Sequence, residues 1–128
     1  MNKELDPRFI EMKEYLESIG GLVNGWYIDR PPIVDPHFMS IDLGWYPLVL
    51  DLIKNIVALG WDKEICQIKQ KFAGLRFYTN GITDEISRLI DKAESKSFKT
   101  CEKCGNDGKS RNIDGWYTTL CDKCYEQN

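Results

Sequence analysis

The sequence predicts an α+β fold: a small antiparallel β-hairpin or sheet packed with about three helices, followed by a C-terminal zinc-ribbon or treble-clef-like knuckle. Three segments carry apolar residues at helical spacing, and one segment alternates apolar and polar residues around a turn. Four of the five cysteines form two pairs near the end of the chain. In these 128 residues we expect an α+β domain over residues 1–98 and a zinc-binding ribbon or knuckle over 99–128.

The first predicted helix covers residues 7–19. Asp6 is a suitable N-cap, and Pro7 fits the first helical position. The apolar face is predicted to consist of Phe9, Met12, Leu16 and Ile19. After it, "LVNGWYI" (residues 22–28) predicts a short hairpin with a tight turn at Asn24–Gly25, and a proline-rich connection follows.

The second predicted helix covers residues 45–59 and should be the most buried element, because apolar residues occupy most of its circumference. Pro47 is tolerated there only because it lies in the first turn. Trp45 is expected to anchor the start of this helix.

Residues 64–79 predict a β-hairpin with one apolar and one polar face. Its apolar face should contain Ile68 and Phe72, together with Cys66 as a buried thiol that fills core space. Ala73–Gly74 fits the turn, with Gly74 in the left-handed region. The polar face should carry Gln67, Lys69, Lys71, Arg76 and Tyr78.

The third predicted helix covers residues 83–97, with Thr83 as its cap. Its inward stripe should consist of Ile82, Ile86, Leu89, Ile90 and Ala93. Its outer face should carry Arg88, Lys92 and Lys96, either as a solvated surface or as an anion-binding row.

The C-terminal spacing C-x2-C-x16-C-x2-C is typical of a four-cysteine zinc site. The predicted ligands of a structural Zn²⁺ are Cys101, Cys104, Cys121 and Cys124. Asp114–Gly115 should turn a hairpin between the two pairs, and Gly105 should let the chain curl around the first pair. Four thiolates fill a tetrahedral shell, so we expect this metal to fold the chain rather than to catalyse.

The segments "CQIKQKFAGLRFYTNG", "CEKCG" and "GWYTTLCDKC" resemble a family of small bacterial and phage proteins. That family has a QIKxKFxGLRFY hairpin and a C-terminal CxxC…CxxC or CxxH zinc site. The resemblance covers about residues 44–124; Ala73 replaces a glycine common in the family, and Cys124 replaces a histidine common there. It implies an intracellular, sometimes viral, setting and a protein that works by binding, but no particular activity.

The net charge and the distribution of apolar and acidic residues argue against several classes of function. The net charge is −3, and zinc bound to four thiolates would bring it to about −5, which argues against nucleic acid as a partner. No segment resembles a membrane span, and acidic residues near the N-terminus argue against a signal peptide, so we expect a cytoplasmic protein.

Catalysis is not the expected function. The single histidine, His37, has no nucleophile motif or second metal ligand near it in the sequence, although Asp35 and Asp42 could converge on it. No phosphate-cradling glycine motif is present. We therefore expect a non-enzymatic binding protein.

Aromatic residues make up 12% of the chain, and they indicate where binding would occur. Trp26, Tyr27 and Tyr78 are expected to be exposed, whereas Trp116 is expected to cover the zinc hairpin. Tyr78 beside cations is suited to stack a base and pair a phosphate. The candidate ligand residues are Arg76, Tyr78, Lys69, Lys71, Arg30, Trp26 and Tyr27.

These residues predict a protein that sequesters a small anionic nucleotide-like ligand. The phage setting implied by the resemblance, rather than any residue, suggests that such a protein would blunt a nucleotide-signalled host defence. One alternative is a docking or inhibitor module for a host protein that uses the zinc hairpin and exposed aromatics. A nucleic-acid adaptor is a further alternative. On a simple solvated surface, the same cations would instead pair with nearby acids. The oligomeric state, including a homo-oligomer, is left open.

Overall fold

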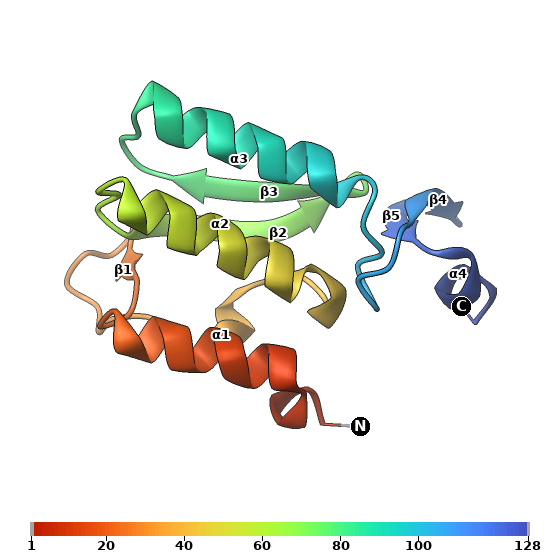
Figure 1. Cartoon of the computed structure of the whole chain (residues 1–128), viewed down its shortest axis with the longest axis horizontal. Helices are drawn as coiled ribbons and strands as arrows, with labels where there is room; N and C mark the ends of the chain where they lie inside the picture. Colours follow the sequence, from red (N-terminus) through yellow and green to blue (C-terminus); the bar gives the residue numbers. More distant parts are fainter. Residues whose placement is uncertain (1, 128) are drawn as a thin grey trace.

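Helix α2 (Tyr46–Ala58) lies at the centre of the computed structural model, which describes residues 2–127. Val49, Ile53 and Ile56 on this helix are fully buried. Figure 1 shows α2 between two other helices that run beside it. The prediction of a central, largely buried second helix is confirmed, with its ends within one residue of the expected positions.

The flanking helices are α1 (Pro7–Ser18) and α3 (Asp84–Ser97). Both predicted caps are confirmed: the Asp6 carboxylate accepts the Arg8 backbone N–H at 2.9 Å, and the Thr83 hydroxyl accepts the Ile86 N–H at 3.2 Å. These side chains satisfy backbone donors that have no partner within the helix. The inward side chains of both helices were predicted correctly except for Ile82, which precedes α3 and is exposed.

A three-stranded sheet packs against the helical layer through its apolar face. Its strands are β1 (Val23–Asn24), β2 (Glu64–Lys71) and β3 (Gly74–Thr79), in the order β1-β2-β3. Strands β2 and β3 are antiparallel and form the predicted hairpin, whereas β1 pairs in parallel with β2.

The tight hairpin predicted at residues 22–28 is wrong. The chain does not turn back on itself at Asn24, because this segment pairs with β2. The Val23 and Gly25 N–H groups donate to the carbonyls of Lys63 and Ile65. The chain returns only at Ile33, which forms an antiparallel bridge with Leu22.

The turn between β2 and β3 differs from the prediction. Phe72 and Ala73, not Gly74, occupy the left-handed region, with φ of 52° and 70°. A two-residue hairpin loop of this type needs positive φ at both central positions. Gly74 is needed for another reason: a Cβ there would lie 2.4 Å from the Phe98 ring. Phe72 consequently leaves the core and is 65% exposed.

The start of β2 also departs from simple alternation. The pairing register shifts between Ile65 and Gln67, which is the signature of a β-bulge. Ile65 and Ile68 therefore both face the core, and Cys66 does not fill the core as predicted. Its thiol is half-buried and lies 3.5 Å from the Asn80 side-chain oxygen.

The C-terminal part consists of a second hairpin and a short helix. The hairpin pairs β4 (Lys109–Ile113) with β5 (Trp116–Leu120), and α4 (Asp122–Glu126) follows. The predicted Asp114–Gly115 turn is confirmed by positive φ at both residues. Three short 3-10 helices complete the fold: Lys3–Leu5, Pro36–Phe38 and Leu43–Trp45.

The C-terminal part is joined to the helical layer by a buried carboxylate. Glu102 accepts the Asp42 backbone N–H at 3.0 Å and the Thr118 hydroxyl at 3.2 Å. Its burial raises the pKa of the carboxyl above its usual value. The Gly44 N–H donates to the Glu102 carbonyl at 2.7 Å, so this segment passes very close to the start of α2.

Gly44→Ala should destabilise the protein strongly, although it adds only one methyl group. The added Cβ would lie 2.3 Å from the Cys101 carbonyl oxygen and 2.4 Å from that of Glu102, so backbone must move. We expect a loss of about 1–3 kcal/mol in the free energy of unfolding, measured by urea denaturation. Gly81→Ala is the matched control, because a Cβ there meets nothing within 4 Å. Equal stability of the two variants would show that the close approach is not present in solution.

Candidate functional site

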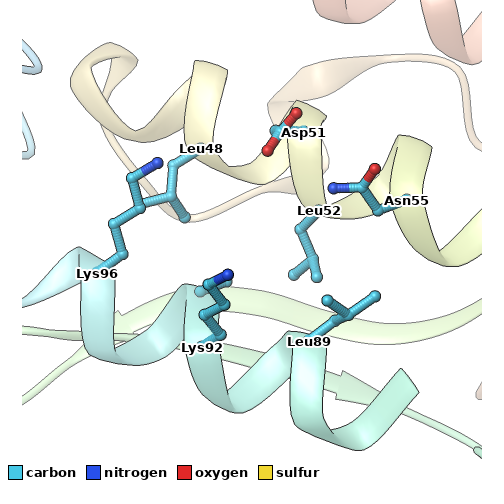
Figure 2. A pocket seen from close by; sticks show the side chains of 8 residues that line it. Leu48, Asp51, Leu52, Asn55, Leu89, Lys92 and Lys96 are labelled. Atoms are coloured by element: carbon cyan, nitrogen blue, oxygen red, sulfur yellow. The ribbon is translucent and has the colours of Figure 1, made fainter. Parts of the chain in front are cut away.

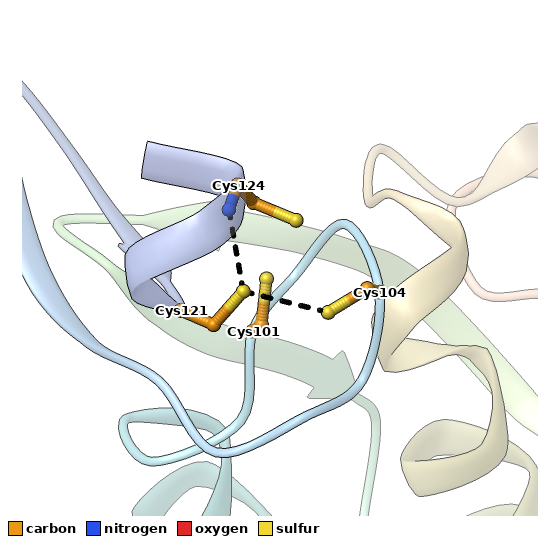
Figure 3. A group of neighbouring side chains, drawn as sticks. All are labelled: Cys101, Cys104, Cys121 and Cys124. Atoms are coloured by element: carbon orange, nitrogen blue, oxygen red, sulfur yellow. Dashed lines mark hydrogen bonds between the residues drawn. The ribbon is translucent and has the colours of Figure 1, made fainter. Parts of the chain in front are cut away.

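The four C-terminal cysteines form a cluster with the dimensions of a metal site. Their sulfur atoms all lie within 4.8 Å of one another, and those of Cys104 and Cys121 are 3.7 Å apart. Zinc–sulfur bonds of about 2.3 Å in a tetrahedron place the sulfurs about 3.8 Å apart. Figure 3 shows the four side chains directed toward a common centre. These residues can therefore hold a metal ion of this size and preference.

The first cysteine pair lies in a tight turn, or knuckle, in which a backbone N–H group points toward a sulfur atom. Gly105 adopts φ of +90°, as predicted, and its N–H donates to the Cys101 carbonyl at 2.9 Å. The Asn106 N–H then points at the Cys104 sulfur, 3.5 Å away. Such donors favour the thiolate form that a metal requires.

The second pair lies at the start of helix α4. Cys121 is its N-cap, and its sulfur accepts the Cys124 N–H at 3.3 Å. The order of elements is thus knuckle, hairpin and helix, with two ligands in the first helical turn. Of the two expected arrangements, this one is treble-clef-like rather than a ribbon.

The cysteine thiols influence one another strongly. Burial tends to raise the pKa of Cys101, but backbone N–H donors of Cys121, Cys104 and Lys103 outweigh it and lower that pKa to about 7. Burial and the adjacent sulfurs raise the pKa of Cys124 to about 12. A bound divalent ion would stabilise the thiolate form of all four ligands.

The exposed face of the sheet gathers several of the predicted ligand residues. Lys69 pairs with Arg76 and Gln67 with Tyr78 across β2 and β3, so these four side chains and Lys71 share one face. The opposite face carries buried apolar residues, Ile68, Leu75 and Phe77. No acidic residue occurs between positions 65 and 79.

Tyr78 is 44% exposed, as expected, and the Lys69 ammonium lies 5.9 Å from the centre of its ring. Arg76 is engaged elsewhere: its guanidinium forms an ion pair with Glu94 of α3. A small cavity of about 170 Å³ lies between this part of β3 and α3. Lys69 and Lys71 are therefore the cations of this face that have no carboxylate partner among the described ion pairs.

Trp26, Tyr27 and Arg30 belong to the loop after β1, on the other side of β2. Trp26 is 69% exposed, and its indole N–H donates to the Cys66 carbonyl at 2.9 Å. The Arg30 guanidinium lies 4.9 Å from the ring centre of exposed Tyr27. The prediction that both aromatics are exposed is confirmed.

The exposure of three aromatic residues, Phe72, Trp116 and Tyr117, was not predicted from the sequence. Phe72 lies at the hairpin turn, and its ring centre is 6.5 Å from that of Tyr117 on β5. Trp116, the residue before Tyr117, is 65% exposed. The prediction that it covers the zinc hairpin is therefore wrong. The signal in the sequence was the short turn, since a two-residue loop between Lys71 and Gly74 places Phe72 outside the sheet.

The predicted cation row of α3 is exposed, and two of its members border a groove. Lys92 and Lys96 line a cavity of about 160 Å³ between α2 and α3, whose floor includes Leu52 and Leu89. Figure 2 shows both lysines extending from α3 toward α2, which contributes Asp51 to the opposite side. The groove thus combines both signs of charge and does not form a purely cationic site.

The possible convergence around His37 is only partly observed. Its Nδ1 lies 2.8 Å from the Asp35 carboxylate, and its Nε2 lies 3.6 Å from that of Glu4. The Asp42 backbone is instead held by Glu102. The arrangement is exposed, and the structure places no nucleophilic hydroxyl or thiol in contact with the ring in any described interaction.

No helix within residues 2–127 has the length and apolar character needed to span a membrane. Comparisons with protein-family models, with curated proteins and with solved structures found no match to this chain.

Proposed function

We propose that this chain is a non-enzymatic zinc protein that binds a small anionic nucleotide-like ligand on the exposed face of its sheet. The observation that carries the proposal is the strand register, which places Lys69, Lys71 and Tyr78 together on one face of the sheet.

Zinc is the metal that best suits the four-cysteine cluster. It accepts four thiolates in a tetrahedron without redox chemistry, and it is the usual ion of such sites. The full ligand shell leaves no position for water or substrate, so the ion acts on the fold. Its role is to fix β4, β5 and α4 against the rest of the protein.

The ligand would be held by two kinds of contact. Tyr78 offers a planar ring for stacking a base, which is worth about 1–3 kcal/mol per base. Lys69 and Lys71 offer ammonium groups to a phosphate. Arg76 acts indirectly, because its ion pair with Glu94 fixes the end of β3. Trp26, whose indole is fixed to β2, would border the same region.

Tyr78→Ala should weaken nucleotide binding about fivefold or more, because it removes the stacking surface. Binding is measured by isothermal titration and by the rise in melting temperature with a panel of mono-, di- and cyclic nucleotides. Tyr78→Phe is the control that retains the ring and should bind nearly as well. If no nucleotide binds the wild-type protein, or if a nucleotide is consumed, the proposal is wrong.

A second candidate function is docking to a host protein through the zinc hairpin. It is favoured by the exposed rings of Phe72, Trp116 and Tyr117, of which Phe72 and Tyr117 are in contact, because exposed aromatics carry much of the energy of protein interfaces. In this case a host protein should co-purify with the chain and be lost in Trp116→Ala but kept in Tyr78→Ala. Retention of the partner by Trp116→Ala would argue against this candidate.

A further inference from the structure

The exposed face of β2 carries two aromatic–cation pairs in succession, where a single nucleotide needs only one. The first pair is Lys69 with Tyr78, and the second is Lys71 with Phe72, whose ring centre is 5.6 Å from the ammonium. The turn places Phe72 at the end of the strand, so the second pair extends the first along β2.

The spacing of the two pairs suits an extended nucleic-acid strand. Lys69 and Lys71 are two residues apart, which is about 7 Å along a β-strand. Tyr78 pairs with Gln67, five positions before Phe72, so the two aromatic residues are about 16 Å apart along the strand. This separation is too long for neighbouring bases, so stacking on both rings requires a segment of several nucleotides whose bases are unpaired.

The exposure of Phe72 is maintained at an energetic cost. Phe72 and Ala73 both have positive φ, a conformation that costs about 1–2 kcal/mol per residue for anything but glycine. A core position or an Asn–Gly turn would avoid this cost. Strained positions that persist are concentrated at binding and catalytic sites. The turn is thus better explained by the need for an exposed ring than by the stability of the hairpin.

From these observations we propose that the ligand of this face is a single-stranded nucleic-acid segment of several nucleotides. The inference rests on the proposed function and specifies its ligand class. One base stacks on Tyr78 and a later base of the same strand on Phe72, while Lys69 and Lys71 pair with the intervening phosphates. Tyr117, at 6.5 Å from Phe72, continues the aromatic surface onto the zinc hairpin.

The test is fluorescence polarisation with labelled thymidylate oligomers of one, two, four and eight nucleotides and the full-length zinc-loaded chain. We expect the tetranucleotide to bind at least fivefold more tightly than the mononucleotide. For two phosphate contacts, log K should fall with log salt concentration with a slope of about −1.4. An unlabelled duplex of the same length should not compete, because its bases are already stacked.

Phe72→Asn separates this inference from the proposed function. Asparagine tolerates positive φ, so the variant should fold at least as well as the wild type while it lacks the ring. We expect it to bind the tetranucleotide about 5- to 100-fold more weakly and the mononucleotide with unchanged affinity. Lys92→Gln, on α3 at the groove beside α2, is the control for loss of one charge and should bind normally.

Equal affinity for one and four nucleotides, with no effect of Phe72→Asn, would overturn the inference and leave a mononucleotide site at Tyr78. Failure of every thymidylate and every nucleotide in the panel to bind would instead reject the proposed function itself. Preference for the duplex over the single strand would also overturn the inference.

Discussion

Removal of the metal is expected to unfold the C-terminal hairpin and to lower the melting temperature of the whole chain. Structural zinc sites contribute about 10–16 kcal/mol of apparent binding free energy at neutral pH, which becomes folding free energy. Strands β4 and β5 form a two-stranded sheet, which is marginal on its own in water. Without the ion, the knuckle and α4 lose the link that holds this hairpin together.

Chelation followed by circular dichroism and thermal denaturation measures this effect. Cys104→Ser removes one ligand and should give the same result without a chelator. Cys66→Ser is the matched control, because Cys66 lies outside the cluster and its loss should leave the melting temperature nearly unchanged. Unchanged thermal unfolding after both chelation and Cys104→Ser would contradict the structural role of the metal.

Trp45→Ala should destabilise the protein by about 3–5 kcal/mol, which is the second-largest effect we expect. The side chain is fully buried at the start of α2, and its indole N–H donates to the Thr100 carbonyl at 2.8 Å. Thr100 directly precedes the first zinc ligand. The substitution therefore removes core packing and also frees the segment that leads into the knuckle.

Trp45→Phe divides this effect into its two parts, since it keeps much of the apolar volume but loses the indole donor. An unpaired Thr100 carbonyl costs about 1–3 kcal/mol when it stays buried. Urea unfolding of both variants provides the measurement. A loss below 1 kcal/mol for the alanine variant would mean that Trp45 is not the anchor of α2 in solution.

The helices could be predicted because their signals are local. Asp6 and Thr83 each cap a helix through a hydrogen bond to a residue two or three positions later, so a short window of sequence contains both partners. The metal cluster could be predicted equally well, because each short Cys-x-x-Cys turn already brings its own two sulfurs together. In these cases, residues that are close in the structure are also close in the sequence.

The errors arose where distant segments decide the local conformation. Gly25 looked like part of a turn, yet its backbone pairs with β2, which is 40 residues away in the chain. The bulge at Cys66 follows from pairing with Thr79 and Tyr78 and leaves no trace in the alternation of β2 alone. Phe72 was assigned to the core by its apolar character, whereas the length of the turn determined its position.

The candidate ligand site was only partly predictable for the same reason. The shared face of Lys69 and Tyr78 follows from strand alternation once the hairpin is assumed. The ion pair of Arg76 with Glu94 does not, because it depends on how α3 packs beside the edge of the sheet. The sequence therefore indicated the composition of the face but not which of its cations were free.

Native mass spectrometry, combined with alkylation of thiols, can determine whether a closed thiolate–metal centre builds the scaffold and leaves function to the sheet. We expect one zinc ion per chain and four cysteines that resist alkylation until the metal is removed. Purified chain without stoichiometric metal, or with those four sulfurs joined as disulfides, would contradict it.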